Sequence, residues 1–91
     1  MAASTDKIRE VVEAVREVTG HRGPLDTHAN LLQTRVVKSV ELLVLVGDIE
    51  ERFDVSITPR DVTEGALSTI ERIADLVAAR SGRAPAREVT P

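Results

Sequence analysis

Apolar residues recur every three or four positions in three segments of this chain, and that spacing limits the fold more than any other feature. A period of this length places the apolar side chains on one face of a helix, where burial supplies most of the stability. The apolar positions are Ile8, Val11, Val12, Val15 and Val18 in residues 5–19, Leu42, Leu45, Val46, Ile49 and Phe53 in residues 39–53, and Ile70, Ile73, Ala74 and Val77 in residues 68–80. No stretch alternates apolar and polar residues for long enough to build a sheet, so we expect an all-α fold.

A long connection, residues 20–38, separates the first two predicted helices. It begins at Gly20, a residue that suits the end of a helix, and contains further turn residues. A connection of this length is uncommon unless it packs against its domain or serves a function. We therefore expect its apolar residues to anchor it along the bundle; they are Leu25, Leu31, Leu32, Val36 and Val37.

A third, short helix is indicated after residue 57. Thr58 can cap it, Pro59 suits its first turn, and Asp61 adds an acid near its positive end. We expect this helix to end near Gly65.

The last helix is expected to begin at Ser68, which forms a capping-box pattern with Glu71, and to end near Arg80. The chain is thus predicted to be a four-helix bundle with a long first loop and a short third helix. We assign residues 1–81 to one domain and expect residues 82–91 to form a disordered tail, because they contain two prolines and no apolar period.

Composition argues against several classes of function. The chain has no Cys, which excludes a disulfide scaffold and a thiolate metal site, and Phe53 is its one aromatic residue, which disfavours stacking on nucleic-acid bases. Residues 40–79 carry nine acidic and three basic residues and favour a basic partner over a phosphate backbone. No apolar run approaches the roughly 20 residues of a membrane span, and no signal-peptide pattern opens the chain. We expect a cytoplasmic protein, monomeric by default, that binds neither nucleic acid nor membrane.

Few residues are candidates for catalysis or metal binding. His21 and His28 are the only imidazoles, and two histidines on a loop fall short of the three or four ligands that a metal site needs. We interpret them as ordinary exposed loop residues. Glu50, Glu51 and Asp54 are interpreted as a solvated helix face. The chain is therefore not expected to be an enzyme.

Ser39 stands where the long connection meets the second helix, and two interpretations of it are open. It is either an N-cap serine, whose hydroxyl accepts a backbone N–H, or a serine displayed for covalent modification. A phosphate attached at this point would meet the positive end of the helix.

The second helix also carries apolar residues on the face opposite its core stripe. This face is a candidate docking surface because Val40 and Val44 lie there among acids. Its residues are Val40, Glu41, Val44, Gly47, Asp48 and Glu51, with Lys38 beside them.

The segments LLQTRVVKSVELL at residues 31–43 and DIEERFDVSI at residues 48–57 resemble the acyl and peptidyl carrier proteins. In that family a serine opens the second helix within an Asp-Ser-Leu motif, and the phenylalanine of a Glu-Glu-x-Phe ending follows fourteen residues later. Ser39 and Phe53 stand at that spacing. The resemblance covers roughly residues 5–80 and implies a bundle of acyl-carrier type.

The resemblance implies that a phosphopantetheinyl transferase attaches 4′-phosphopantetheine from coenzyme A to Ser39. The terminal thiol of this arm then holds an acyl or aminoacyl group as a thioester, so the protein itself needs no Cys. The expected role is a free-standing carrier in polyketide, fatty acid or nonribosomal peptide biosynthesis, and its partners are the loading and downstream enzymes.

Two residues depart from the family pattern. Lys38 replaces the Asp before the serine, and Arg35 stands where a Gly is common three residues earlier. Lys38 either weakens modification or pairs with the phosphodiester once it is attached. The alternative is a degenerate carrier fold that is never modified and acts as a non-covalent interaction module.

Overall fold

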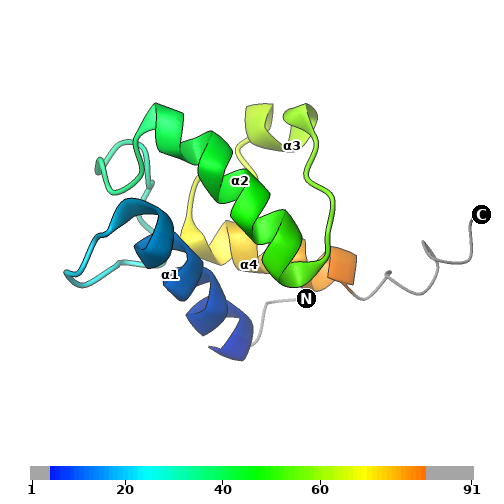
Figure 1. The fold of residues 1–91 in the computed structure, drawn as a ribbon, viewed down its shortest axis with the longest axis horizontal. Helices are drawn as coiled ribbons and strands as arrows, with labels where there is room; N and C mark the ends of the chain where they lie inside the picture. Colours follow the sequence, from blue (N-terminus) through cyan, green and yellow to red (C-terminus); the bar gives the residue numbers. More distant parts are fainter. Residues whose placement is uncertain (1–4, 82–91) are drawn as a thin grey trace, which may run out of the picture.

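The computed structural model describes residues 5–81, and these fold into four helices without a strand (Figure 1). The helices are α1 (Thr5–Thr19), α2 (Ser39–Phe53), α3 (Pro59–Thr63) and α4 (Ile70–Ser81). The all-α fold, the long first connection and the short third helix are confirmed. The expected tail, residues 82–91, lies outside the described residues. None of the helices within residues 5–81 has the length and hydrophobicity that a membrane crossing requires.

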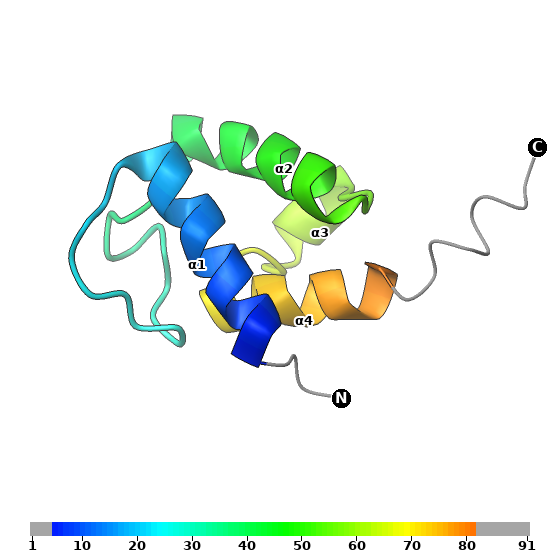
Figure 2. The ribbon, with the colours of Figure 1, turned by 60° about the horizontal axis from the view of Figure 1, so that its bottom comes forward.

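The core lies where α1, α2 and α4 face one another. α1 packs against both α2 and α4, whereas α3 lies on the side of the molecule away from α1 (Figures 1 and 2). The buried apolar residues are Val11, Ala14, Val15, Leu31, Val37, Leu45, Ile49, Phe53, Val55, Ile57, Leu67, Ile70, Ile73, Ala74 and Val77. All the helical positions that the spacing predicts either belong to this core or pack against it.

The first connection is fastened to the start of α4 through its backbone. The Leu31 N–H donates to the Ser68 carbonyl at 2.8 Å, and the Glu71 N–H donates to the Thr27 carbonyl at 3.0 Å. These two hydrogen bonds explain how a connection without regular structure stays ordered on the bundle.

Four of the five expected anchors of this connection pack inward: Leu31, Val37, Leu25 and Val36. The expectation is wrong for Leu32, which is 42% exposed. The cause is a turn at Asn30, whose side-chain oxygen accepts the Leu32 N–H at 3.0 Å. The turn places the residue after Leu31 on the outer side of the connection.

The start of α3 is capped as predicted, since the Thr58 hydroxyl accepts the Asp61 N–H at 3.2 Å. The expected capping box at Ser68 is wrong. Because α4 begins at Ile70, the residue in the capping position is Thr69, and its hydroxyl accepts the Arg72 N–H at 3.0 Å. The Ser68 hydroxyl instead donates to a carbonyl in the turn before it.

Candidate functional site

Ser39 is the first residue of α2, and its side chain is exposed. The N-cap position belongs to Lys38, whose backbone is extended at φ −82° and ψ 158°. The interpretation of Ser39 as an N-cap is therefore wrong, because its backbone is already helical. Within residues 5–81 its hydroxyl has no hydrogen-bond partner.

A carboxylate performs the capping that the serine does not. Glu41 Oε1 accepts the backbone N–H of Lys38 at 2.9 Å, and the first helical bond runs from the Leu42 N–H to the Lys38 carbonyl at 3.0 Å. The start of α2 is thus fixed without the hydroxyl of Ser39, which stays available for chemistry.

Ser39 lies at a surface pocket of about 420 Å³. Its other lining residues are Leu32, Gln33, Arg35, Val37 and Lys38. An arm tethered through a phosphate needs an accessible hydroxyl and nearby groups that favour negative charge. The exposed hydroxyl of Ser39 and the basic residues of this pocket fit that requirement.

Arg35 occupies this pocket with a left-handed backbone, at φ 64°. Residues with a Cβ adopt this conformation at a cost, whereas glycine adopts it freely. This chain therefore places a charged side chain at a position where glycine would be free of strain.

The outer face of α2 exposes three apolar residues near its start: Val40 is 72% exposed, Leu43 is 74% and Val44 is 59%. The sequence predicted Val40 and Val44 on this face, and the structure adds Leu43. A Cβ added at Gly47, the next position along the face, would meet open space.

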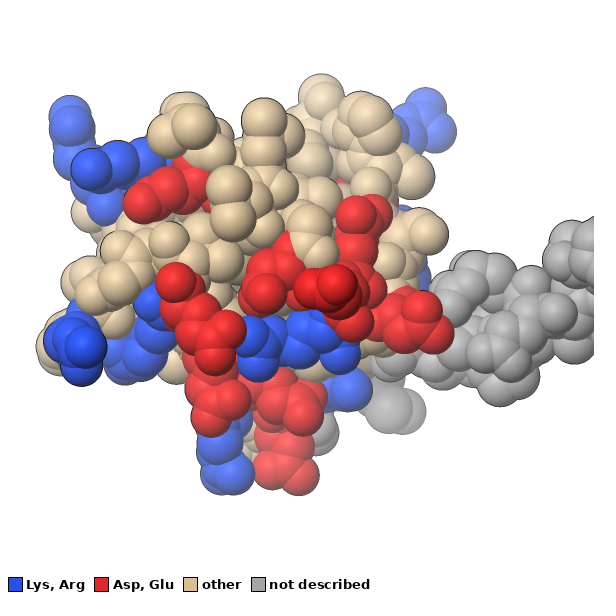
Figure 3. Space-filling model, viewed as in Figure 1, with Lys and Arg blue, Asp and Glu red and all other residues tan. Residues whose placement is uncertain are grey.

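Two acids of this face, Asp48 and Glu51, lie beyond its apolar part, whereas Glu41 lies within it and accepts the Lys38 N–H. Glu51 is exposed, whereas Asp48 forms an ion pair with Arg52, in which Oδ2 and Nε lie 3.3 Å apart. Figure 3 shows this side of the molecule: uncharged atoms fill most of its upper part, with charged atoms at the upper corners, and charged atoms of both signs gather below. The outer face of α2 is thus apolar near Ser39 and charged toward its far end.

A family profile described as a phosphopantetheine attachment site matches residues 9–77. The chain belongs to this family. The match covers most of the chain and includes the pocket, Ser39 and the whole of α2. No curated protein and no solved structure matches the chain significantly.

A phosphopantetheine attachment domain is the site at which 4′-phosphopantetheine is bound covalently, so this is the cofactor of the chain. Its general role is that of a phosphopantetheine carrier, and carrier domains generally interact with a phosphopantetheinyl transferase and with biosynthetic enzymes. Such domains are typically non-catalytic.

The histidines of this carrier domain lie in different surroundings. His28 is exposed as expected, and its Nε2 lies 3.1 Å from a carboxylate oxygen of Glu71. His21 is only partly exposed, and its Nε2 is buried without a partner in the described residues, so the expectation of an exposed side chain is wrong for His21. Residues 5–81 contain no group of three or more potential ligands that could hold a metal ion.

The interpretation of Glu50 as part of a solvated face is also wrong. Glu50 is partly buried, and its carboxylate accepts the Ile57 N–H at 2.8 Å, which ties the link after α2 back to the helix. Glu51 and Asp54 are exposed, as expected for a solvated face.

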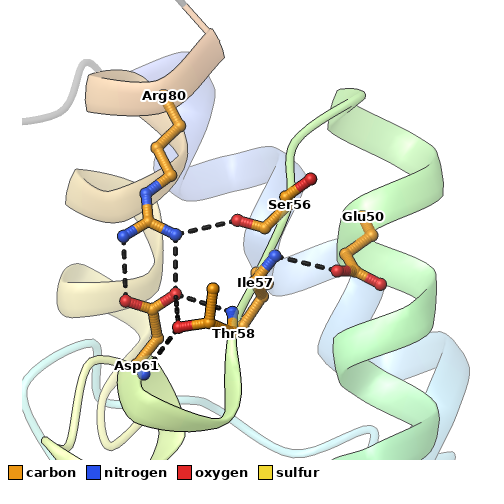
Figure 4. A network of polar contacts seen from close by, with 6 residues as sticks. All are labelled: Glu50, Ser56, Ile57, Thr58, Asp61 and Arg80. Carbon is orange, nitrogen blue, oxygen red and sulfur yellow. Dashed lines mark hydrogen bonds and ion pairs between the residues drawn. The ribbon is translucent and has the colours of Figure 1, made fainter.

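Sequence reasoning missed a buried ion pair at the other end of the molecule (Figure 4). Asp61, 7% exposed, accepts from both terminal nitrogens of Arg80 at 2.6 and 2.8 Å. The same arginine donates to the Ser56 carbonyl at 2.8 Å. The hydrogen bonds from Arg80, followed by that from the Thr58 N–H, hold the pKa of Asp61 far below its ordinary value. The only signal in the sequence was the pairing potential of an acid and a base nineteen residues apart.

Proposed function

We propose that Ser39 is the residue that bears the 4′-phosphopantetheine arm. The observation that supports this proposal is the exposed hydroxyl at the first position of α2, without a partner in residues 5–81 and at the rim of a pocket. Ser39 also lies inside the matched residues 9–77. A hydroxyl that stabilised the fold would instead be bonded to the backbone.

The residues around Ser39 favour a phosphate at this place. The first backbone N–H groups of a helix lack partners inside the helix and carry its positive end, so they attract an anion. When bound, the arm supplies a terminal thiol that holds acyl or aminoacyl groups as thioesters. The part of the chain itself is to position the attachment oxygen on a helix held by the core.

We further propose that the outer face of α2 docks the enzymes that load and use the arm. Val40 and Val44 supply exposed apolar contact beside Ser39, and Glu51 supplies negative charge farther along. The complete proposed docking surface is Lys38, Val40, Glu41, Leu43, Val44, Gly47, Asp48 and Glu51. Apolar contact here contributes affinity, and the acids contribute association rate and selectivity.

The attachment site is tested by intact-mass measurement. The purified protein is incubated with coenzyme A and a promiscuous phosphopantetheinyl transferase, and one added phosphopantetheine is expected. Ser39→Ala should gain no mass. Ser56→Ala is the matched control, because Ser56 is also exposed and its backbone contact to Arg80 survives the substitution. An adduct that persists on Ser39→Ala would remove the assignment.

The rival role, an unmodified interaction module, rests on Lys38 beside the attachment serine. If a transferase requires an acid at this position, the wild type will gain no mass and Lys38→Asp will. That pair of results would favour the rival, whereas an adduct on the wild type excludes it.

A further inference from the structure

The pocket at Ser39 contains two basic side chains, those of Arg35 and Lys38. We propose that these two residues bind the phosphodiester of the attached arm and hold the phosphate end of the arm in the pocket. The inference rests on the proposed attachment at Ser39 and adds the residues that recognise the phosphate. Both lie on the stretch of chain that leads into α2.

Neither cation is neutralised by a partner in the described part of the chain, residues 5–81. Among residues 5–81, Arg35 and Lys38 form no ion pair and their side chains are exposed. Other exposed arginines do find carboxylates, such as Arg9 with Asp6 at 3.6 Å.

The sequence around the pocket is short of acids. No Asp or Glu stands between Asp26 and Glu41, and the carboxylate of Glu41 is held by the backbone N–H of Lys38. Figure 3 shows basic atoms at the corner of this face where α2 begins, with acidic atoms next to them. A local excess of positive charge therefore lies beside the attachment oxygen.

The backbone of Arg35 supports a role for its side chain. At φ 64° a glycine would be free of strain, yet the chain places an arginine there. A strained conformation of this kind points to a use for the side chain that bears it.

The two side chains suit the two needs of a phosphodiester. The group carries one negative charge and two non-bridging oxygens. An arginine contacts two oxygens at once through its planar fork, and a lysine acts as a compact point charge. An acid at position 38 would repel the phosphate, so Lys38 changes the surroundings of the arm from repulsive to attractive.

The experiment uses the loaded protein and the ³¹P resonance of its phosphodiester. Holo wild type, Arg35→Gln, Lys38→Gln and the double variant are compared at low ionic strength and at about 0.5 M salt, where surface charges are screened. The wild-type resonance should be displaced from that of the double variant at low salt, the single variants should lie between them, and salt should remove the difference. Arg72→Gln is the matched control, because Arg72 is exposed and forms no ion pair within residues 5–81; its resonance should coincide with that of the wild type.

A second measurement requires no variant. The Nε–H resonance of Arg35 should shift when the wild type is converted from apo to holo protein, and that of Arg72 should not. A holo protein in which neither the phosphorus nor the Arg35 resonance responds overturns the inference and leaves attachment at Ser39 intact. A wild type that gains no mass removes the attachment and this inference together, so the two failures are distinguishable.

Discussion

The two ends of α2 are held in opposite ways. At its start the one side-chain contact to the backbone comes from Glu41, and the hydroxyl of Ser39 has no partner within the described residues. At its far end Glu50 ties down the following link, and Arg52 pairs with Glu17 of α1 at 2.5 Å. Side-chain polar contacts are thus concentrated away from the proposed attachment site.

The two ends of α2 therefore differ in role: the far end holds the helix in the fold, whereas the start carries Ser39 on the surface. The far end of α2 leads into the link that the Asp61–Arg80 pair fastens to α4, so three helices are joined there (Figure 4). A reactive group is positioned best when it stands on a rigid element. Under the proposed function the start of α2 is open to partners, and the stability of the helix is supplied by the core and by its far end.

The largest expected effect on stability comes from the core, against which the whole of α2 packs. Leu45→Ala should lower the free energy of unfolding by about 2–5 kcal/mol, because Leu45 is fully buried and its loss leaves a cavity. Chemical denaturation measures this change. Leu43→Ala is the matched control: the same residue type, two positions earlier and 74% exposed, should change stability by less than about 0.5 kcal/mol. Equal losses would show that the two faces of α2 are wrongly assigned.

The next prediction tests the supported end. Asp61→Asn should lower the free energy of unfolding by about 1–3 kcal/mol, since it removes the charge that Arg80 faces; the partial exposure of Arg80 keeps the loss below that of a fully buried pair. Glu64→Gln, which removes a surface pair with Arg60, should have little effect. Loading of Ser39 by a transferase should proceed at the wild-type rate in both. If Asp61→Asn alone slowed the loading reaction, the contacts at the far end of α2 would not be independent of the function of Ser39.

Low pH should weaken the Asp61–Arg80 ion pair near the far end of α2. The folded pKa of Asp61 is lowered, so its contribution to stability is complete above its unfolded pKa of about 3.9 and is lost as the pH falls toward the folded value. Below about pH 4, unfolding free energy should therefore decrease more steeply in the wild type than in Asp61→Asn. Denaturation at a series of pH values checks this, and parallel curves would deny Asp61 its role.

The contrast between the ends also explains what the sequence could predict. Apolar spacing located the three long helices and most of the core, because burial of one face decides where such helices lie, and capping residues located α3. It did not reveal the Asp61–Arg80 pair, which depends on how α3 and α4 are placed in space. Nor did it reveal that Lys38 is the capping residue, since helix boundaries shift by a residue or two without changing the apolar pattern.

A smaller effect is expected at the open end. Arg35→Gly should raise the free energy of unfolding of the apo protein by about 0.5–1 kcal/mol, because relief of the left-handed strain exceeds the added flexibility of the unfolded chain. Arg35→Gln keeps the Cβ and should bring no gain. Denaturation of the two variants side by side checks this: equal stabilities would mean that the strain at this position does not exceed the cost of the added flexibility that glycine brings to the unfolded chain.

The smallest effect on stability, and the sharpest test of display, is expected at Val44. Val44→Glu should change the free energy of unfolding by less than about 0.5 kcal/mol, because the side chain is 59% exposed on the outer face. The same change should lower kcat/KM for loading by a transferase about five- to tenfold, since an apolar contact of roughly 1 kcal/mol is replaced by a charge that must be desolvated. Thr63→Glu adds the same charge on exposed α3 and should leave loading unchanged. A loss of loading in both variants would trace the effect to net charge. A loss in Val44→Glu alone would place the contact with the transferase on α2. The face of α2 that contributes least to stability would then be the one that partners recognise.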